Sequence, residues 1–253
     1  MGVVENRYKW RHNCVLRTLA EAIREKLAYV NTLPDDAKAV SSIAFVKAGS
    51  SMTNKQAERH RQLGLLASAR DWSCDFDLPE YHHFPRPPYE LPADVGATSN
   101  RIDAFIVSRK TQVLIAGPEL TVPMEDNLEK QHTLKMERYQ GMASCLHPGW
   151  RLAGTICVEM GCRGVDPPSF GQGLRLLGFG PKEIRDLRDN CAYIARFCSY
   201  LIWLNRYKAD FSCPRIYWAG DRVMMDSSYV ATDGVRVERT AFGHGVDRSA
   251  DTA

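Results

Sequence analysis

The sequence predicts an α/β fold in which a mixed β-sheet of about four strands is flanked by helices. Segments with the two-residue period of strands and segments with the three-to-four-residue period of helices follow one another along the chain. Their predicted order is helix, three strands, helix, strand and helix, which is typical of a mixed sheet. A length of 253 residues with 44% hydrophobic residues is sufficient for one core of this kind.

The first elements follow from the spacing of apolar residues. Between Asn13 and Val30, apolar residues recur mostly at steps of three and four, which predicts an amphipathic helix with Asn13 as its N-cap. A short strand over residues 43–46 and a charged helix over residues 53–62 are expected next. Apolar and polar residues then alternate over residues 72–78, and this two-residue period predicts a half-buried strand.

A Pro-rich loop is predicted over residues 79–100, because five of the thirteen prolines lie within residues 79–92. Two β-rich segments follow, over residues 102–107 and 112–122, with a turn over residues 108–111 between them. These two strands are expected to pair as a hairpin.

Helices and one strand are expected in the next part of the chain. Pro123 is expected to end the preceding strand and to open a helix that reaches about Met142. Residues 152–158 predict a further buried strand, a helical region follows Pro168, and its main helix begins near Pro181. One stripe of this last helix is apolar and is expected to face the core: Ile184, Leu187, Cys191, Ile194, Cys198 and Leu201.

These elements are assigned to one domain over residues 1–210, with the Pro-rich loop 79–100 inside it. Residues 211–253 are expected to be a C-terminal extension. Ser, Asp, Thr and Gly make its last part polar, and we expect disorder beyond about residue 224.

Composition excludes several classes of protein. No segment approaches the ~20 apolar residues of a membrane helix, and the first residues lack a secretory signal, so an intracellular protein, nuclear or cytoplasmic and without a membrane partner, is expected. The eight cysteines contain no Cys-x-x-Cys, which favours free thiols over disulfides or a structural zinc site. Residues 1–70 carry 12 Lys/Arg against 6 Asp/Glu, compatible with a polyanionic partner or a solvated helix face.

Two carboxylates, Asp103 and Glu119, interrupt apolar strands. A carboxylate on an apolar face is costly to bury without a partner, so both are candidate site residues. Both approach the same end of the predicted hairpin, and a bulge at Gly117–Pro118 would bring them together across an offset of ~10 Å. Two convergent carboxylates with carbonyl oxygens nearby suit Mg²⁺ or Mn²⁺. The alternative is that each carboxylate lies in solvent at a strand end.

The helix expected after Pro123 places a lysine on its inward face. Its residues at steps of three and four share that face: Leu128, His132, Lys135, Tyr139 and Met142. Lys135 could then lie across the carboxylate pair, where it could orient or deprotonate a water or neutralise a phosphate. The alternative is a lysine whose ammonium reaches solvent beside a core tyrosine.

Four more residues are candidates without a specific signal of their own. Glu125 lies near the helix start, where it complements the helix dipole or assists a metal. Arg11 and His12 precede the first predicted helix and could contact a phosphate, support the metal ligands or lie on the surface. Arg163, in the sequence Gly-Cys-Arg-Gly at 161–164, is open to the same interpretations.

Taken together, these residues resemble a known nuclease family. The similarity covers about residues 8–206, and its most specific part is the stretch 119–139 with Asp103 upstream. The family is the restriction-like endonuclease domain at the C-terminal end of site-specific non-LTR retrotransposon proteins, which belongs to the PD-(D/E)XK class. The matching residues are Trp-Arg-His-Asn at 10–13, Asp103, Glu-Leu-Thr-Val-Pro-Met-Glu-Asp-Asn at 119–127, Lys135 and Tyr139.

The resemblance implies a restriction-endonuclease-like core with C-terminal helices and a metal-dependent cut in DNA. Asp103 and Glu119 match the residues that bind Mg²⁺ or Mn²⁺, helped by a carbonyl near Leu120. Lys135 matches the lysine that helps to activate water. Supporting positions of the family are matched by Arg11, His12, Glu125 and Tyr139.

The chain also departs from the family. Ile102 stands where relatives have proline, and Thr121 stands where many relatives have lysine. There is no Tyr-x-Asp-Asp polymerase motif and no Cys/His knuckle, so a detached nuclease module that cannot reverse transcribe is expected. We expect a DNA endonuclease that nicks a phosphodiester by water attack. The alternatives are a catalytically inactive nucleic-acid-binding remnant and a protein-interaction domain with the same sheet.

Overall fold

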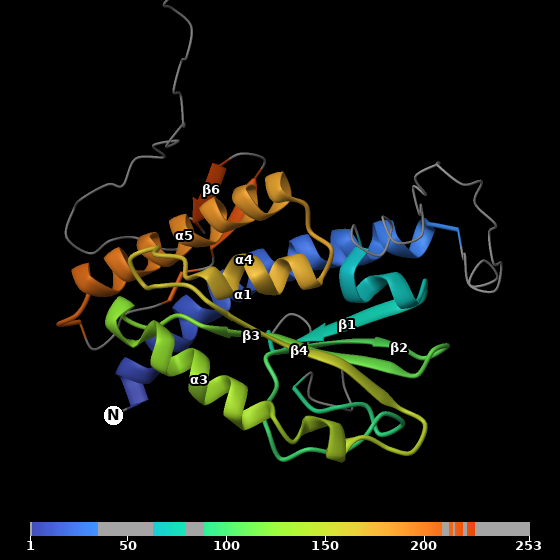
Figure 1. Ribbon diagram of the computed structural model, residues 1–253. Helices are drawn as coiled ribbons and strands as arrows, with labels where there is room; N and C mark the ends of the chain where they lie inside the picture. The colour runs from blue at the N-terminus through green and yellow to red at the C-terminus, as the bar shows by residue number, and fades with distance from the viewer. Residues whose placement is uncertain are drawn as a thin grey trace, which may run out of the picture.

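A four-stranded mixed sheet forms the centre of the computed structural model, which describes residues 2–34, 63–78, 89–208, 213–214, 216–219 and 222–225 (Figure 1). Its strands are β1 (Trp72–Phe76), β2 (Ala104–Ser108), β3 (Val113–Thr121) and β4 (Arg151–Glu159). They lie side by side in the order β1-β2-β3-β4, with β1, β2 and β3 antiparallel and β4 parallel to β3. The predicted α/β class and mixed sheet are therefore confirmed.

Helices cover both faces of this sheet. The helices are α1 (Gly2–Thr32), α3 (Leu128–Tyr139), α4 (Pro168–Leu176) and α5 (Pro181–Leu204). In Figure 1, α1, α4 and α5 lie on one side of the sheet and α3 lies on the other. Side chains of β2 alternate between the two faces, so both faces are apolar and need a cover. Ala104 and Ile106 belong to the core under α1 and α5, whereas Phe105 belongs to the core that includes Tyr139 of α3.

Two expected elements, the strand at 43–46 and the helix at 53–62, lie outside the described residues, as does the loop segment 79–88. The expected strand over 72–78 corresponds to β1. The remaining part of the predicted loop, from residue 89 to residue 100, contains no helix or strand apart from a single bridge between Gly96 and Leu146.

Helix α1 begins at Gly2, well before the expected cap at Asn13, so the predicted start is wrong. The earlier turns bury Arg7 and Arg11, which are 5% and 7% exposed. The guanidinium of Arg7 donates to the carbonyl of Asn205 at 2.9 Å, so the arginine is buried with a partner. Buried arginines interrupt the apolar period, and hydrophobic spacing alone therefore misses these turns.

Helix α3 is shorter than expected, because Pro123 does not open it. The carbonyl of Pro123 accepts the N–H of Cys162 at 2.8 Å, so the chain continues beside the β4 end before it turns. Short 3₁₀ turns over Glu125–Asn127 and Met142–Cys145 flank the helix. The predicted inward face is confirmed, because Tyr139 and Met142 are 2% and 1% exposed.

Helix α5 is the most accurately predicted helix. It starts at Pro181, and all six residues of the expected stripe are buried. After it, an unexpected hairpin pairs β5 (Ile216–Ala219) with β6 (Arg222–Met225). Ile216 is 2% exposed and belongs to the main core, so the chain after residue 211 contributes to the packing.

All eight cysteines are free thiols, and five of them are buried. Within the described ranges, no helix combines the length and the hydrophobicity required to cross a lipid bilayer.

Candidate active site

A shift of register in β3 sets the position of Glu119. Strand β3 pairs with β4 through Ala116 and Thr155, and the next pair is Glu119 and Cys157, so β3 has one residue more than β4 over this interval. This is the bulge that the sequence predicted at Gly117–Pro118. The pairing with β2 ends at the same place, because Ala116 opposite Phe105 is its last pair.

Gly117 makes this bulge sterically possible. Its φ of +117° is a conformation that favours glycine, and a Cβ at this position would lie 2.4 Å from the carbonyl oxygen of Ile156. The residue after the Gly117–Pro118 pair is Glu119, whose side chain is directed to the face of the sheet that α3 covers.

Asp103 and Glu119 are held together by reciprocal hydrogen bonds. The main-chain N–H of Asp103 donates to Glu119 Oε1 at 3.0 Å, and the N–H of Leu120 donates to Asp103 Oδ2 at 3.1 Å. Glu119 is completely buried, and the side chain of Asp103 is 15% exposed. Each carboxylate thus takes the place of a ladder carbonyl where the two strands separate.

Lys135 of α3 bridges the two carboxylates. Its Nζ lies 2.7 Å from Asp103 Oδ2 and 3.2 Å from Glu119 Oε2. The side chain is 12% exposed, so the ammonium does not simply extend into solvent. The predicted convergence of Asp103, Glu119 and Lys135 on one site is therefore confirmed as a geometry.

His12 of α1 completes the cluster from the opposite side of the sheet edge. Its Nε2 lies 3.2 Å from the carbonyl oxygen of Leu120 and 3.5 Å from Asp103 Oδ2. His Nδ1 is 3.2 Å from Asn13 Oδ1, on the neighbouring residue of the helix. His12 was a candidate without a specific signal, and the structure places it in direct contact with Asp103.

The charges of the cluster shift one another's pKa values. Burial alone would raise the pKa of Asp103, but the adjacent His12 and Lys135 outweigh it and hold this pKa well below its usual range. Burial would lower the pKa of Lys135, and the two carboxylates reverse this and raise it above its usual value. His12 behaves likewise, its pKa raised by Asp103 against the effect of burial. Lys135 is therefore protonated at neutral pH.

The pKa of Glu119 is shifted in the direction opposite to that of Asp103. Burial and the neighbouring Asp103 carboxylate raise its pKa to about 7, against the ordinary value of 4.5. Lys135 pulls this pKa down without compensating the two larger effects. The cluster is thus short of positive charge when both carboxylates are ionised.

This donor set fits a hard divalent cation. The contacts described for Asp103 are made through Oδ2, so Oδ1 is left for a ligand, and the Glu119 carboxylate and the Leu120 carbonyl belong to the same cluster. In the described part of the chain, no group of three or more His, Cys, Asp and Glu side chains could hold a metal. A cation would therefore rest on two carboxylates, main-chain oxygen and water, as Mg²⁺ commonly does.

Tyr139 and Arg11 hold the backbone around the cluster. The hydroxyl of Tyr139 donates to the carbonyl of Arg101 at 2.9 Å and so fixes the segment that leads into Asp103. Arg11 donates to the carbonyl of Val122 at 2.8 Å, which ties α1 to the end of β3.

Glu125 is not part of the cluster. Its carboxylate accepts the main-chain N–H of Arg163 at 2.7 Å and the Nε of the same residue at 2.6 Å. Gly161 allows this approach, because a Cβ there would lie 2.6 Å from Glu125 Oε1. The structure therefore gives Glu125 and Arg163 a joint role in fixing the loop after β4.

A buried carboxylate on β4, Glu159, was not predicted from the sequence. Glu159 is completely buried, its oxygens lie 3.0 and 3.1 Å from His132 Nδ1, and the hydroxyl of Ser169 donates to it. The signal was present, since Glu159 ends an apolar strand as Glu119 does, and His132 shares the α3 face of Lys135.

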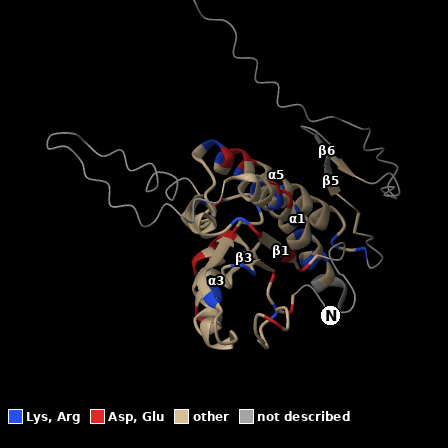
Figure 2. Ribbon diagram, turned by 90° about the vertical axis from the view of Figure 1, so that its right-hand side faces the viewer, with Lys and Arg blue, Asp and Glu red and all other residues tan. Residues whose placement is uncertain are grey.

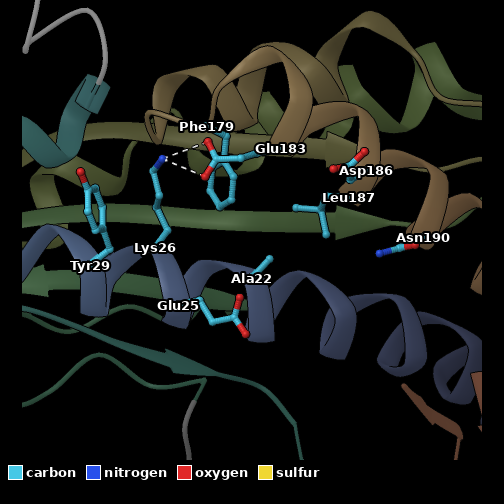
Figure 3. Close-up of a pocket in the computed structure, with 9 residues that line it drawn as sticks. All are labelled: Ala22, Glu25, Lys26, Tyr29, Phe179, Glu183, Asp186, Leu187 and Asn190. Atoms are coloured by element: carbon cyan, nitrogen blue, oxygen red, sulfur yellow. Dashed lines mark hydrogen bonds and ion pairs between the residues drawn. The ribbon is translucent and has the colours of Figure 1, made fainter. Parts of the chain in front are cut away.

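A pocket of about 600 Å³ lies apart from this cluster, between α1 and α5 (Figure 3). Lys26 points into it and is already paired with Glu183 at 3.1 and 3.2 Å, next to the ring of Phe179. Along α1, Lys26 is roughly 21 Å from His12 at ~1.5 Å per residue. The pocket is thus separate from the carboxylate cluster.

Comparisons of the chain with protein-family models, with curated proteins and with solved structures found no match.

Proposed function

We propose that this protein is a metal-dependent DNA endonuclease of the restriction-like, PD-(D/E)XK class. The observation that carries the proposal is the bridge that Lys135 makes between Asp103 and Glu119 beside the bulge of β3. The order α1, β1, β2, β3, α3, β4 supports a restriction-endonuclease-like core, which the sequence resemblance led us to expect. An intracellular place of action, nuclear or cytoplasmic, belongs to the same proposal.

Asp103 and Glu119, with the Leu120 carbonyl beside them, would hold Mg²⁺ or Mn²⁺. A bound ion of this kind polarises a phosphate oxygen and lowers the pKa of a coordinated water. The raised pKa of Glu119 supports this assignment, because a further cation would relieve the deficit of positive charge in the cluster.

Lys135 would act through its fixed charge. Its raised pKa keeps the ammonium protonated at neutral pH, so it stabilises the negative charge that develops on the scissile phosphate and does not abstract a proton. His12 Nε2 donates to the Leu120 carbonyl and lies 3.5 Å from Asp103 Oδ2, and so holds both in position.

The test is nicking of supercoiled plasmid by the purified full chain with Mg²⁺, with Mn²⁺ and with chelator. Asp103→Asn removes the charge and keeps the shape of a ligand, whereas Asp94→Asn is a matched control at a half-exposed carboxylate paired with Arg109. The proposal expects metal-dependent nicking by the wild type and by Asp94→Asn, with Asp103→Asn at background. DNA binding without nicking by the wild type would favour an inactive binding remnant.

A further inference from the structure

The C-terminal end of α5 and the turn that follows it expose an unusual group of flat side chains. Tyr200, Trp203 and Tyr207 are 56%, 57% and 86% exposed. Together with Arg206 we call these residues the α5 platform. Large aromatic side chains that remain this exposed on one patch indicate an interaction surface.

The α5 platform is ordered by its own contacts. The rings of Tyr200 and Trp203 stack with centroids 6.3 Å apart and an interplanar angle of 19°. The guanidinium carbon of Arg206 lies 4.6 Å from the Trp203 ring and 4.4 Å from the Tyr207 ring. The guanidinium of Arg206 also donates to the Trp203 carbonyl at 2.8 Å, which holds it in this position. The four planar groups therefore form a continuous, partly preorganised surface.

The charge of the platform is suited to a polyanion. The first turns of α5 carry acidic and basic residues, and Figure 2 shows this mixture of red and blue beside the basic residues of α1. From residue 190 to residue 208 there is no Asp or Glu, whereas Arg196, Arg206 and Lys208 lie in this stretch. An acidic partner thus meets no carboxylate from this stretch of the chain.

The α5 platform lies next to the candidate active site. Helices α1 and α5 run antiparallel, with Arg11 donating to Ser199, the residue before Tyr200, at 3.0 Å. His12, the next residue of α1, contacts Asp103 of the cluster. One turn earlier, Tyr8 is 51% exposed and lies 5.3 Å from the Arg11 guanidinium. Tyr8 therefore adds an exposed aromatic ring beside Arg11, whose own side chain is buried and links the platform end of α5 to α1.

We propose that the α5 platform binds single-stranded DNA by stacking unpaired bases on Trp203 and Tyr207, with Arg206 between them. Exposed aromatic rings with interleaved arginine stack any base, and nearby basic residues follow the phosphates. Its position beside the cluster rests on the proposed function: the nuclease would act where duplex DNA has a single-stranded flank. The binding itself does not depend on cleavage.

The test measures anisotropy of a labelled oligothymidine strand titrated with the full chain in the presence of chelator. Trp203→Ala and Tyr207→Ala should each raise the dissociation constant roughly 5- to 100-fold, the range expected for loss of one stacked base. Trp203→Tyr should restore most of the affinity because it keeps a ring. The matched control is Tyr29→Ala, since Tyr29 is 57% exposed at the far end of α1 and should bind as the wild type does.

Equal affinities for the wild type, Trp203→Ala and Tyr207→Ala would overturn the proposal. A wild-type dimer that Trp203→Ala dissociates, seen by light scattering with strand binding unchanged, would overturn it as well, because the platform would then be an interface between copies. The plasmid assay separates this proposal from the nuclease: loss of strand binding in Trp203→Ala supports the platform even if the wild type does not nick DNA.

Discussion

At the residue scale, the cluster places the ammonium of Lys135 and the imidazole of His12 against two carboxylates. Asp103 and Glu119 could be predicted as site residues because carboxylates on apolar strands need partners. Lys135 could be predicted because it interrupts an inward helix face. The contact of His12 with Asp103 could not be predicted in this way, since it depends on how α1 packs against the end of β3. Periodicity identifies a face of an element, and only tertiary packing identifies the partner.

Loss of Lys135 should destabilise the protein. Lys135→Met leaves Asp103 and Glu119 close together and largely buried without their bridging cation, which should lower the free energy of unfolding by about 2–4 kcal/mol. Adding Glu119→Gln removes the unpaired charge and should recover a large part of the loss. Urea unfolding of both variants measures this, and a Lys135→Met protein as stable as the wild type would refute the bridging role.

The stability of the metal-free protein should depend on the ionisation of Glu119. Its pKa is raised to about 7 in the folded chain, so the stabilisation from the neutral carboxyl is complete below the ordinary value of 4.5 and is lost as the pH rises to about 7. Glu119→Gln cannot ionise, so its stability relative to the wild type should increase between about pH 5 and about pH 8, by roughly 1–3 kcal/mol.

Thermal unfolding across this pH range, with and without Mg²⁺, gives the comparison. Mg²⁺ should raise the melting temperature of the wild type more at about pH 8 than at about pH 5, because it competes with the proton on Glu119. A difference between the two proteins that is constant with pH would show that Glu119 does not titrate as described.

At the scale of elements, one extra residue in β3 decides whether the two carboxylates meet. The glycine–proline pair made the bulge predictable from the sequence, and the face of α3 followed from spacing alone. The start of α1 could not be predicted from spacing, because its first turns bury arginines. The position of Glu125 was also missed, because its partner Arg163 lies on a loop that is distant in the sequence.

Gly117→Ala should disrupt the bulge. The added Cβ would meet the Ile156 carbonyl at 2.4 Å in a backbone conformation that alanine disfavours, so we expect a loss of about 2 kcal/mol or more. Gly141→Ala is the matched control, because its Cβ would have no atom within 4 Å, and it should change stability by less than ~0.5 kcal/mol. Denaturant unfolding compares them, and equal stabilities would contradict the steric account.

At the scale of the whole molecule, α1 and α5 join distant parts of the chain into one core. The mixed sheet and the pairing of β2 with β3 could be derived from the strand and helix periods. The hairpin β5–β6 could not, because its two strands are only four residues each, too short for a clear period. Trp10 of α1 nonetheless donates to the carbonyl of Pro214 at 2.8 Å, which secures the chain just before the hairpin.

The hairpin should therefore contribute to folding. Ile216→Ala removes a side chain that is 2% exposed in the main core, and a loss of roughly 2–4 kcal/mol is expected. Leu176→Ala, at a residue that is 47% exposed, serves as the control and should have a small effect. If Ile216→Ala unfolds at the same denaturant concentration as the control, the hairpin is not part of the domain core.

The nuclease assignment is tested most directly by comparing cleavage and binding in Lys135→Met. This variant should nick supercoiled plasmid in Mg²⁺ at least roughly a hundredfold more slowly than the wild type. The reason is that the ammonium of Lys135 no longer stabilises the charge on the scissile phosphate. Duplex affinity, measured with chelator present, should fall much less, because many basic residues share the phosphate contacts. Equal nicking rates for the wild type and a folded Lys135→Met would contradict the account.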